Sequence, residues 1–316
     1  MKLHNHTKAL VVLNPAAGGG RGLERWLTVE PLVNQKYDSR VVQTDTNGQW
    51  ELTLRKAVAS NVRLFIAAGG DGTVHALLNS LVQTVSREEM HTFTLGAVGL
   101  GSSNDFHKPL KCMAGDIPLR IGSSRMLHDI GQASLSADLS DFIRMKKHFL
   151  ISASLGLVAE ANAFFSGDNT TQKWLRSRST SAAITHAALR TLLSYQNISA
   201  LLRYPDQPEK SISLTNLSIT KSQWLSGSFR YDTSVSANDG LFSVQLCEGM
   251  NRLEAFRTML NLSKGRFIGP AKRSSTKIPT LEVELDKTVI LELDGELYQT
   301  KKVLFKILKE RIGICA

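Results

Sequence analysis

Residues 69–73 read Gly-Gly-Asp-Gly-Thr and stand between a strand-like apolar run and a helix-like run with one apolar face. Glycines leave main-chain N–H groups unobstructed, and a helix beginning at Thr73 would point its positive dipole end at an anion there. Asp71 would repel a bare phosphate, but Mg²⁺ between carboxylate and phosphate neutralises both. A tight turn in which Asp71 only caps the helix is the open alternative.

A second loop of similar composition, Gly-Leu-Gly-Ser-Ser-Asn-Asp, occupies residues 99–105. Its glycines free the chain, Ser102 offers a hydroxyl, and Asn104 and Asp105 offer polar groups. An isolated string of this kind is more typical of a helix cap than of a binding site. It is a candidate binding loop because it follows the next strand-like run along the chain.

Two Asp-Gly pairs occur later, in Asn-Asp-Gly-Leu-Phe at 238–242 and in Asp-Gly-Glu at 294–296. Asp-Gly between strand-like runs is the strongest short signal for a β-hairpin, so a structural role is favoured for both. Spacing alone does not show that Glu296 does chemistry.

The first third of the chain contains the elements that must position these loops. Strand-like runs at 8–13, 38–44, 62–68 and 93–100 alternate with helix-like runs. This alternation predicts a doubly wound parallel sheet covered on both faces. Because ligands bind beyond the carboxyl ends of such strands, we expect the loops at 14–22, 68–73 and 99–105 to gather at one edge.

From about residue 126 the pattern changes to strand-like runs separated by turns, with helix-like interruptions near 173–195 and 251–264. This predicts a mostly antiparallel second domain. We therefore expect an α/β domain over residues 1–127 and a β-rich domain over residues 128–316.

The net charge of +10 and the isoelectric point near 9.6 indicate attraction to an anion. Nucleotide phosphates and an anionic membrane surface both fit, whereas no RNP, KH or zinc-finger pattern supports nucleic acid, which is not expected. The apolar run near the N-terminus is too short for a secretory signal, and three cysteines without a CxxC pair favour a reduced, cytoplasmic location.

Five motifs together resemble the diacylglycerol kinase catalytic family, which includes bacterial lipid kinases and sphingosine kinases. They occur in the family's order at these positions: 14–19, 69–73, 101–105, 238–242 and 294–296. The resemblance implies an α/β nucleotide-binding domain followed by a β-sandwich-like domain. It implies transfer of the γ-phosphoryl group of Mg-ATP to a lipid hydroxyl, with diacylglycerol as the default acceptor.

The resemblance also assigns roles to residues of this chain. Glu296 would be the general base, and Asp71 would act through the catalytic Mg²⁺. A structural Mg²⁺ would bind the Asp239 carboxylate and main-chain oxygens of Ser236 and Leu241. The residues assigned to the nucleotide are Thr44, Gly69, Gly70, Asp71, Gly72, Thr73, Val74, His75, Ser102, Asn104 and Asp105.

One departure from the family pattern keeps alternatives open. The usual acid shortly after the first motif is Ala76 in this chain, and His75 precedes it. We expect His75 to be a surface or cap residue, with donation to a phosphate as the alternative. A catalytically weak relative that only binds nucleotide or membrane is one alternative. A small-molecule kinase similar to NAD kinases, which share the first motif, is the other.

A kinase with a lipid acceptor must contact the bilayer, so we expect peripheral association with an anionic membrane. The run 173–195 mixes Trp174 and leucines with Arg178 and Arg190, which suits an amphipathic helix at that surface. A helix packed on the second domain is an equally good interpretation. The sequence also leaves open whether the chain pairs with a second copy of itself as a homodimer.

Overall fold

The computed structural model describes residues 7–45, 47–137, 143–167 and 169–316. The chain divides into two compact units. The first contains residues up to His128 together with Glu310–Ala316, and the second contains Asp129–Lys309. Both boundaries fall inside long strands, β7 (Arg125–Ser136) and β17 (Glu296–Cys315).

A parallel sheet forms the centre of the first unit, with strand order β2-β1-β3-β4. Its strands are β1 (Lys8–Leu13), β2 (Asp38–Gln43), β3 (Leu64–Gly69) and β4 (Thr94–Gly99). All six residues of β3 are buried, as expected for a parallel sheet covered on both faces. The end of β17 adds a further parallel pairing, in which Gly313 lies opposite Thr94.

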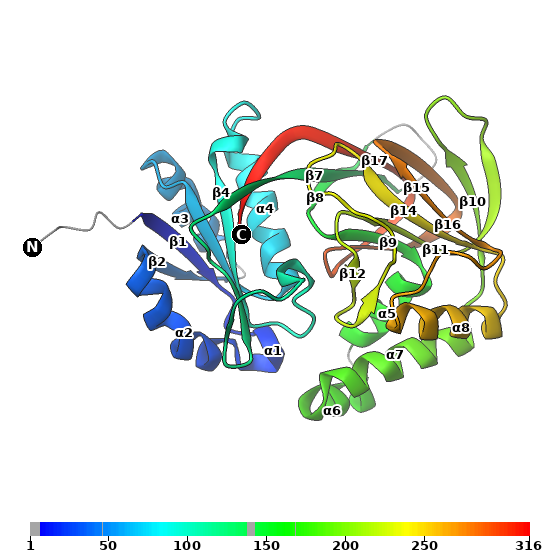
Figure 1. Cartoon of the computed structure of the whole chain (residues 1–316), viewed down its shortest axis with the longest axis horizontal. Helices are drawn as coiled ribbons and strands as arrows, with labels where there is room; N and C mark the ends of the chain where they lie inside the picture. Colours follow the sequence, from blue (N-terminus) through cyan, green and yellow to red (C-terminus); the bar gives the residue numbers. More distant parts are fainter. Residues whose placement is uncertain (1–6, 46, 138–142, 168) are drawn as a thin grey trace, which may run out of the picture. The chain divides into compact units, whose positions relative to one another are not determined.

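Helices cover both faces of this sheet (Figure 1). Ala9, Val11 and Leu13 alternate along β1 and pack with Trp26 and Val33 of α2 (Gly22–Lys36). α3 (Gln49–Ala59) and α4 (Asp71–Thr84) contact β1 as well as each other. The doubly wound α/β prediction is confirmed.

Short elements complete the first unit. They are α1 (Ala17–Gly20), the 3₁₀ turns η1 (Met90–Thr92) and η2 (Asp105–His107), β5 (Met113–Ala114) and β6 (Ile117–Arg120). β6 pairs antiparallel with β4 and β5.

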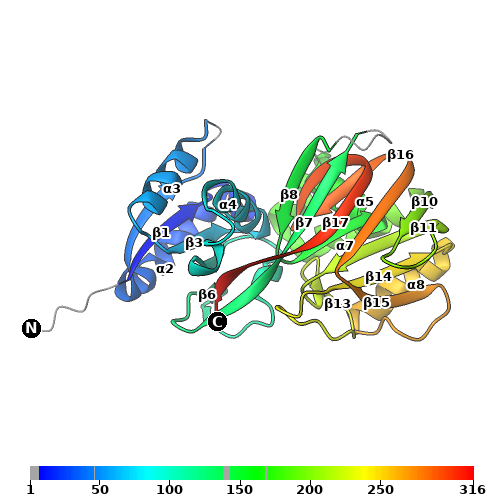
Figure 2. The ribbon, with the colours of Figure 1, turned by 90° about the horizontal axis from the view of Figure 1, so that it is seen from above.

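The second unit is mainly antiparallel, with strand order β15-β14-β11-β10-β16-β17. β9 pairs with β11 and β16, and β7 pairs with β8. Figure 2 shows the long strands β16 and β17 side by side. The strands are β8 (Met145–Phe149), β9 (Ser152–Gly156), β10 (Ile198–Arg203), β11 (Lys210–Thr220), β12 (Trp224–Leu225), β13 (Phe229–Arg230), β14 (Phe242–Glu248), β15 (Arg273–Ile278) and β16 (Thr280–Leu293).

Buried apolar side chains of the strands form the hydrophobic core of the second unit. Within it, Phe149 stacks on Phe242 with 5.6 Å between the ring centroids. Its helices are α5 (Leu157–Ser166), α6 (Thr170–Arg178), α7 (Thr180–Ser194) and α8 (Arg252–Ser263). The single helix expected over 173–195 is wrong, because Ser179 is extended and caps the start of α7 through its hydroxyl. α7 contacts α5, α6 and α8.

Candidate functional site

The loops after β1, β3 and β4 meet at the carboxyl edge of the first unit's sheet. The main-chain N–H of Asn14 donates to the Ala68 carbonyl at 2.8 Å, and the Asn14 amide lies 3.4 Å from the Thr73 hydroxyl. The Leu100 N–H donates to the Gly69 carbonyl at 2.9 Å. The predicted gathering of the three loops is confirmed.

Glycines allow two of these loops to touch. A Cβ on Gly101 would lie 2.4 Å from the Cα of Gly70, a distance that real Cβ atoms do not show. A Cβ on Gly69 would lie 2.1 Å from the Thr73 hydroxyl oxygen. These glycines therefore have a packing requirement in addition to any exposure of their N–H groups to a ligand.

Asp71 joins the same two loops through its carboxylate. Its Oδ2 accepts the main-chain N–H of Asp105, and its Oδ1 accepts that of Phe106, both at 3.0 Å. α4 begins at Asp71 rather than at Thr73 as expected, so this carboxylate projects from the first turn of one helix to the start of η2. The sequence predicted both residues for one site without predicting this bond.

Asn104 closes the second loop on itself. It adopts a left-handed conformation with φ 50°, and its side chain bonds the Gly101 N–H at 3.2 Å and the Gly101 carbonyl at 3.0 Å. Asp105 next to it is 8% exposed and pairs with Lys108 at 2.7 Å. The loop is thus held in one shape by its own polar groups.

His107 is buried beside this ion pair. Burial lowers the pKa of His107 to about 4, aided by the charge of Arg120. His107 is therefore neutral at ordinary pH.

The remaining residues assigned to the nucleotide differ in exposure. Thr44 follows β2, and its N–H donates to the Leu13 carbonyl at 2.8 Å. Ser102 is exposed, whereas Val74 and His75 are 2% and 3% exposed. The expectation of a surface histidine at position 75 is wrong, because the first turn of α4 directs its side chain inward. Contacts of Val74 and His75 with a nucleotide would have to use the main chain.

This arrangement suits an anion. The first N–H groups of a helix have no partner inside that helix, and α4 presents them with the positive end of its dipole where Asn14, Gly70 and Gly101 converge. Glycine-flanked N–H groups at a helix start fit phosphate oxygens.

In the second unit, Asp294 and Gly295 form the turn between β16 and β17, with φ values of 48° and 92°. The predicted hairpin is confirmed. Glu296 is the first residue of β17, lies opposite Leu293 and is exposed. Burial raises the pKa of Tyr298 to about 12, with the charges of Glu296 and Asp294 adding to the effect.

Asp294 was not singled out from the sequence, yet it has the stronger structural role. Its buried carboxylate accepts the N–H groups of Leu150 and Ile151 at 2.9 Å and that of Ser152 at 3.0 Å. It thereby attaches the hairpin to the start of β9. No local signal could have identified partners more than 140 residues away.

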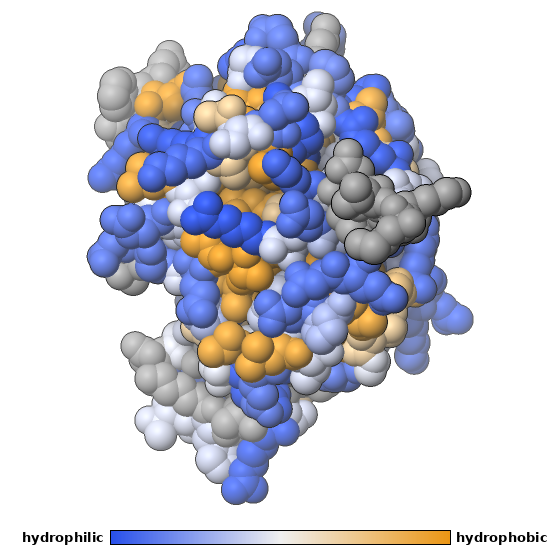
Figure 3. Space-filling model, turned by 90° about the vertical axis from the view of Figure 1, so that its left-hand side faces the viewer, coloured by the Kyte–Doolittle hydropathy of each residue, from blue (hydrophilic) through white to orange (hydrophobic). Residues whose placement is uncertain are grey.

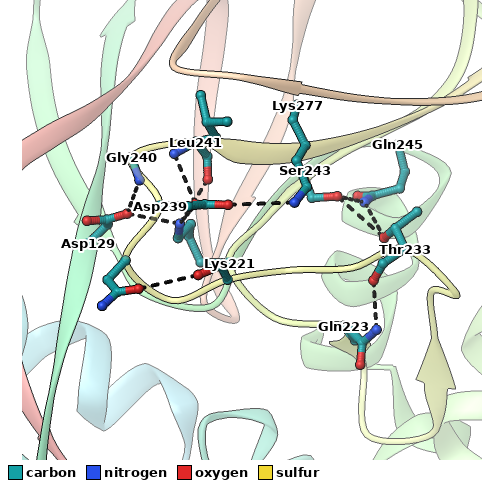
Figure 4. Close-up of polar contacts among 12 residues, drawn as sticks. Asp129, Lys221, Gln223, Thr233, Asp239, Gly240, Leu241, Ser243, Gln245 and Lys277 are labelled. Carbon is teal, nitrogen blue, oxygen red and sulfur yellow. Dashed lines mark hydrogen bonds and ion pairs between the residues drawn. The ribbon is translucent and has the colours of Figure 1, made fainter.

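Two of the three oxygens predicted to bind a structural Mg²⁺, from Asp239 and Leu241, contact a lysine ammonium (Figure 4). The Lys221 Nζ donates to Asp239 Oδ1 at 3.0 Å, to the Leu241 carbonyl at 2.8 Å and to Asp129 Oδ2 at 3.1 Å. Ser236, whose main-chain oxygen was the third predicted ligand, donates its hydroxyl to the Asn238 side-chain oxygen at 3.4 Å. Among the described residues, no group of three or more acidic, histidine or cysteine side chains is placed to hold a metal.

Comparisons with known proteins match both units. The profile of the diacylglycerol kinase catalytic domain matches residues 8–129, and that of the YegS C-terminal NAD kinase β sandwich-like domain matches residues 158–315. A diacylglycerol kinase of Staphylococcus haemolyticus is 22% identical over 315 residues, covering 97% of this chain and 87% of the relative.

Solved structures share the fold. A diacylglycerol kinase from Bacillus anthracis superposes with a TM-score of 0.67 at 16% identity, covering 98% of this chain and 97% of that one. A yeast NADH kinase bound to NADH superposes with a TM-score of 0.51 at 9% identity, covering 99% of this chain and 84% of that one. The α/β unit followed by a β-sandwich-like unit is thus a fold found in both.

Proposed function

This chain belongs to the diacylglycerol kinase family, in the form that carries a YegS-type C-terminal domain, and from that premise we propose that it phosphorylates a lipid. It would transfer the γ-phosphoryl group of ATP to a lipid hydroxyl, with diacylglycerol as the default acceptor. A relative named diacylglycerol kinase that aligns with 97% of this chain supports that choice of acceptor.

The observation that carries the proposal is the bridge from Asp71 to the N–H groups of Asp105 and Phe106. It fixes the second loop against the start of α4, where phosphates would bind through the N–H groups of Gly70 and Gly72. Phosphoryl transfer depends on positioning and charge neutralisation, and Mg²⁺ supplies part of that neutralisation when bound. We also propose that Thr44, Ser102 and the 69–75 main chain contact the nucleotide.

We propose Glu296 as the general base that accepts the proton of the lipid hydroxyl. Its exposed position at a rigid hairpin leaves the carboxylate accessible, as a base requires. General bases contribute about 10²–10⁴-fold to rate. Glu296→Gln keeps the size of the side chain while removing its basicity.

The test is ATP consumption with detergent-dispersed diacylglycerol, with and without Mg²⁺, for the wild type and Glu296→Gln. We expect lipid-dependent turnover that falls at least roughly 100-fold in the variant while ATP binding persists. A lipid-extract screen with labelled ATP identifies the acceptor. Turnover unchanged in the variant would remove Glu296 from the mechanism.

The same assay separates the alternatives. Nucleotide binding without turnover on any lipid would favour the weakly active relative suggested by Ala76. Phosphorylation of NAD in place of lipid would favour a small-molecule kinase.

We further propose that α6 and α8 contact an anionic membrane from the cytoplasmic side. Leu253, Arg257 and Leu260 are exposed and recur every three or four residues, so they share one outward face of α8, and the exposed Lys264 follows directly at its C-terminal cap. On α6, Trp174 is 53% exposed and the Arg178 guanidinium lies 4.7 Å from its ring centre. Basic and apolar side chains together suit a bilayer surface.

No helix among the described residues has the length and apolarity to cross a bilayer. Exposed leucines alone are not diagnostic: Leu27 and Leu32 of α2 are 57% and 44% exposed, and the face in Figure 3 shows apolar patches on a mainly hydrophilic surface. Leu27→Ser/Leu32→Ser is therefore the control for Leu253→Ser/Leu260→Ser. Sedimentation with phosphatidylglycerol vesicles should fall only for the α8 variant, and equal binding by both variants would reject the α8 surface.

A further inference from the structure

Lys221 is a buried lysine at the end of a buried strand. It follows β11 directly, and its side chain has no exposed surface. An ammonium group removed from water is costly unless it is paired and all its protons are bonded. Lys221 meets both conditions, because an ammonium has three donors and three acceptors lie at 2.8–3.1 Å.

The three acceptors come from distant parts of the second unit. Asp129 lies on β7 and is 1% exposed, and its Oδ2 also accepts the Gly240 N–H at 2.7 Å. Asp239 and Leu241 belong to the loop before β14. The Asp129 N–H donates to the Ala237 carbonyl at 2.7 Å, so this loop is attached on both sides of the ammonium.

Charges around the group already balance. The two carboxylates, Asp129 and Asp239, face the Lys221 ammonium and, at 3.6 Å from Asp239, the partly exposed Lys277 ammonium. A divalent cation added to this set would leave a net charge of +2 in a largely buried place. Burial tends to raise the pKa of Asp239, but the hydrogen bonds from Lys221 and the Leu241 N–H, with both lysine charges, lower it overall.

The contacts of the predicted ligands also do not fit a bound metal ion. Mg²⁺ requires oxygens at about 2.0–2.1 Å in near-octahedral arrangement. Two of its three predicted ligands, the Asp239 carboxylate and the Leu241 carbonyl, are bonded to the Lys221 ammonium instead. Displacing that ammonium would leave a buried charge without its acceptors. The residues present therefore do not fit the divalent ion that the resemblance implies.

We infer that the Lys221 ammonium is a built-in replacement for a divalent cation, which holds the 236–241 loop to β7 and β11 without metal. The inference concerns the folding of the second unit and is independent of kinase activity. It implies that any Mg²⁺ requirement of the chain arises from the nucleotide alone.

Thermal unfolding of the full chain without nucleotide, in EDTA and in about 10 mM MgCl₂, tests the inference. We expect no Mg²⁺-dependent shift of the wild-type midpoint. Lys221→Ala should lower the midpoint in EDTA by roughly 10 °C, because it breaks a buried ion pair. Mg²⁺ should restore part of that loss, since the vacated oxygens can then bind it, and Asp239→Asn in the same background should abolish the restoration.

Lys277→Ala is the matched control, because it removes the exposed lysine from the same carboxylate and should shift the midpoint by only about 1–2 °C. A wild-type midpoint that rises with Mg²⁺ would overturn the inference even if Lys221→Ala does not fold. An equal fall of the unfolding midpoint in EDTA for Lys221→Ala and Lys277→Ala would also overturn the inference.

Discussion

The Asp71 carboxylate accepts the main-chain N–H of Asp105 at 3.0 Å, which joins two loops that lie 34 residues apart in the sequence. The same carboxylate bonds the next N–H, that of Phe106. The acid of the Gly-Gly-Asp-Gly-Thr motif therefore has a positioning role whether or not it also acts through Mg²⁺.

Replacing Asp71 by Asn should separate the two roles. Asparagine retains one acceptor oxygen but turns an N–H₂ donor toward the second main-chain N–H, so the first unit should lose about 2 kcal/mol of stability. Calorimetric titration with ATP should show weaker binding both with and without Mg²⁺. Weakening confined to Mg²⁺-containing buffer, at wild-type stability, would instead indicate a metal role alone.

Gly101→Ala should push the two loops apart. The new Cβ would meet the Gly70 Cα at 2.4 Å, and overpacking of this kind costs typically about 1–3 kcal/mol. We expect ATP affinity to drop roughly tenfold, equivalent to about 1.4 kcal/mol. Ser103→Ala in the same loop is the control and should bind ATP like the wild type; parity between the two variants would show that the contact is dispensable.

Asp294→Asn should destabilise the second unit by about 3 kcal/mol, because hydrogen bonds to a charged acceptor are the stronger ones and three N–H groups depend on it. Asparagine tolerates the left-handed φ of 48° at this turn, so the change isolates the carboxylate. Urea unfolding measures the loss. Glu296→Gln changes an exposed carboxylate two residues along the chain and should unfold at the wild-type urea concentration. An equal loss of stability in both variants would show that the three hydrogen bonds to Asp294 do not stabilise the second unit.

His107 should make stability depend on pH. In the unfolded chain His107 binds a proton near pH 6.5, whereas in the folded chain it does so only near pH 4. The stabilisation that depends on neutral His107 is therefore complete above pH 6.5 and is lost as the pH falls toward 4. The loss amounts to about 3 kcal/mol, at about 1.4 kcal/mol per pKa unit. Urea unfolding at several pH values should show a shallower acid slope for His107→Gln. Parallel slopes would mean that His107 titrates normally.

Local patterns were sufficient for much of the first unit and for one hairpin of the second. The helix-like run between the strand-like runs 38–44 and 62–68 forms α3, and the Asp294-Gly295 pair forms the predicted hairpin. Gathering of the loops followed from the rule that parallel strands end at one edge. The helix and the hairpin each depend on residues close together in the sequence, whereas the gathering follows from the topology of a parallel sheet.

Long-range partners account for what was missed. Leu157–Ser166 was not among the helix-like runs predicted beyond residue 126, yet it forms α5 directly after Gly156, which turns with φ 93°. Lys221 gave one weak signal, a lysine directly after a buried strand. Its acceptors lie up to 92 residues away, and no local rule identifies them.

The parallel pairing of Gly313 and Ile314 with Thr94 and Leu95 has a consequence for biosynthesis. While the ribosome is still making the second unit, the beginning of β4 lacks this neighbour, and the nascent sheet presents an unprotected border. A gene fragment ending at residue 128 should yield a protein prone to aggregation, and supplying residues 310–316 should protect it.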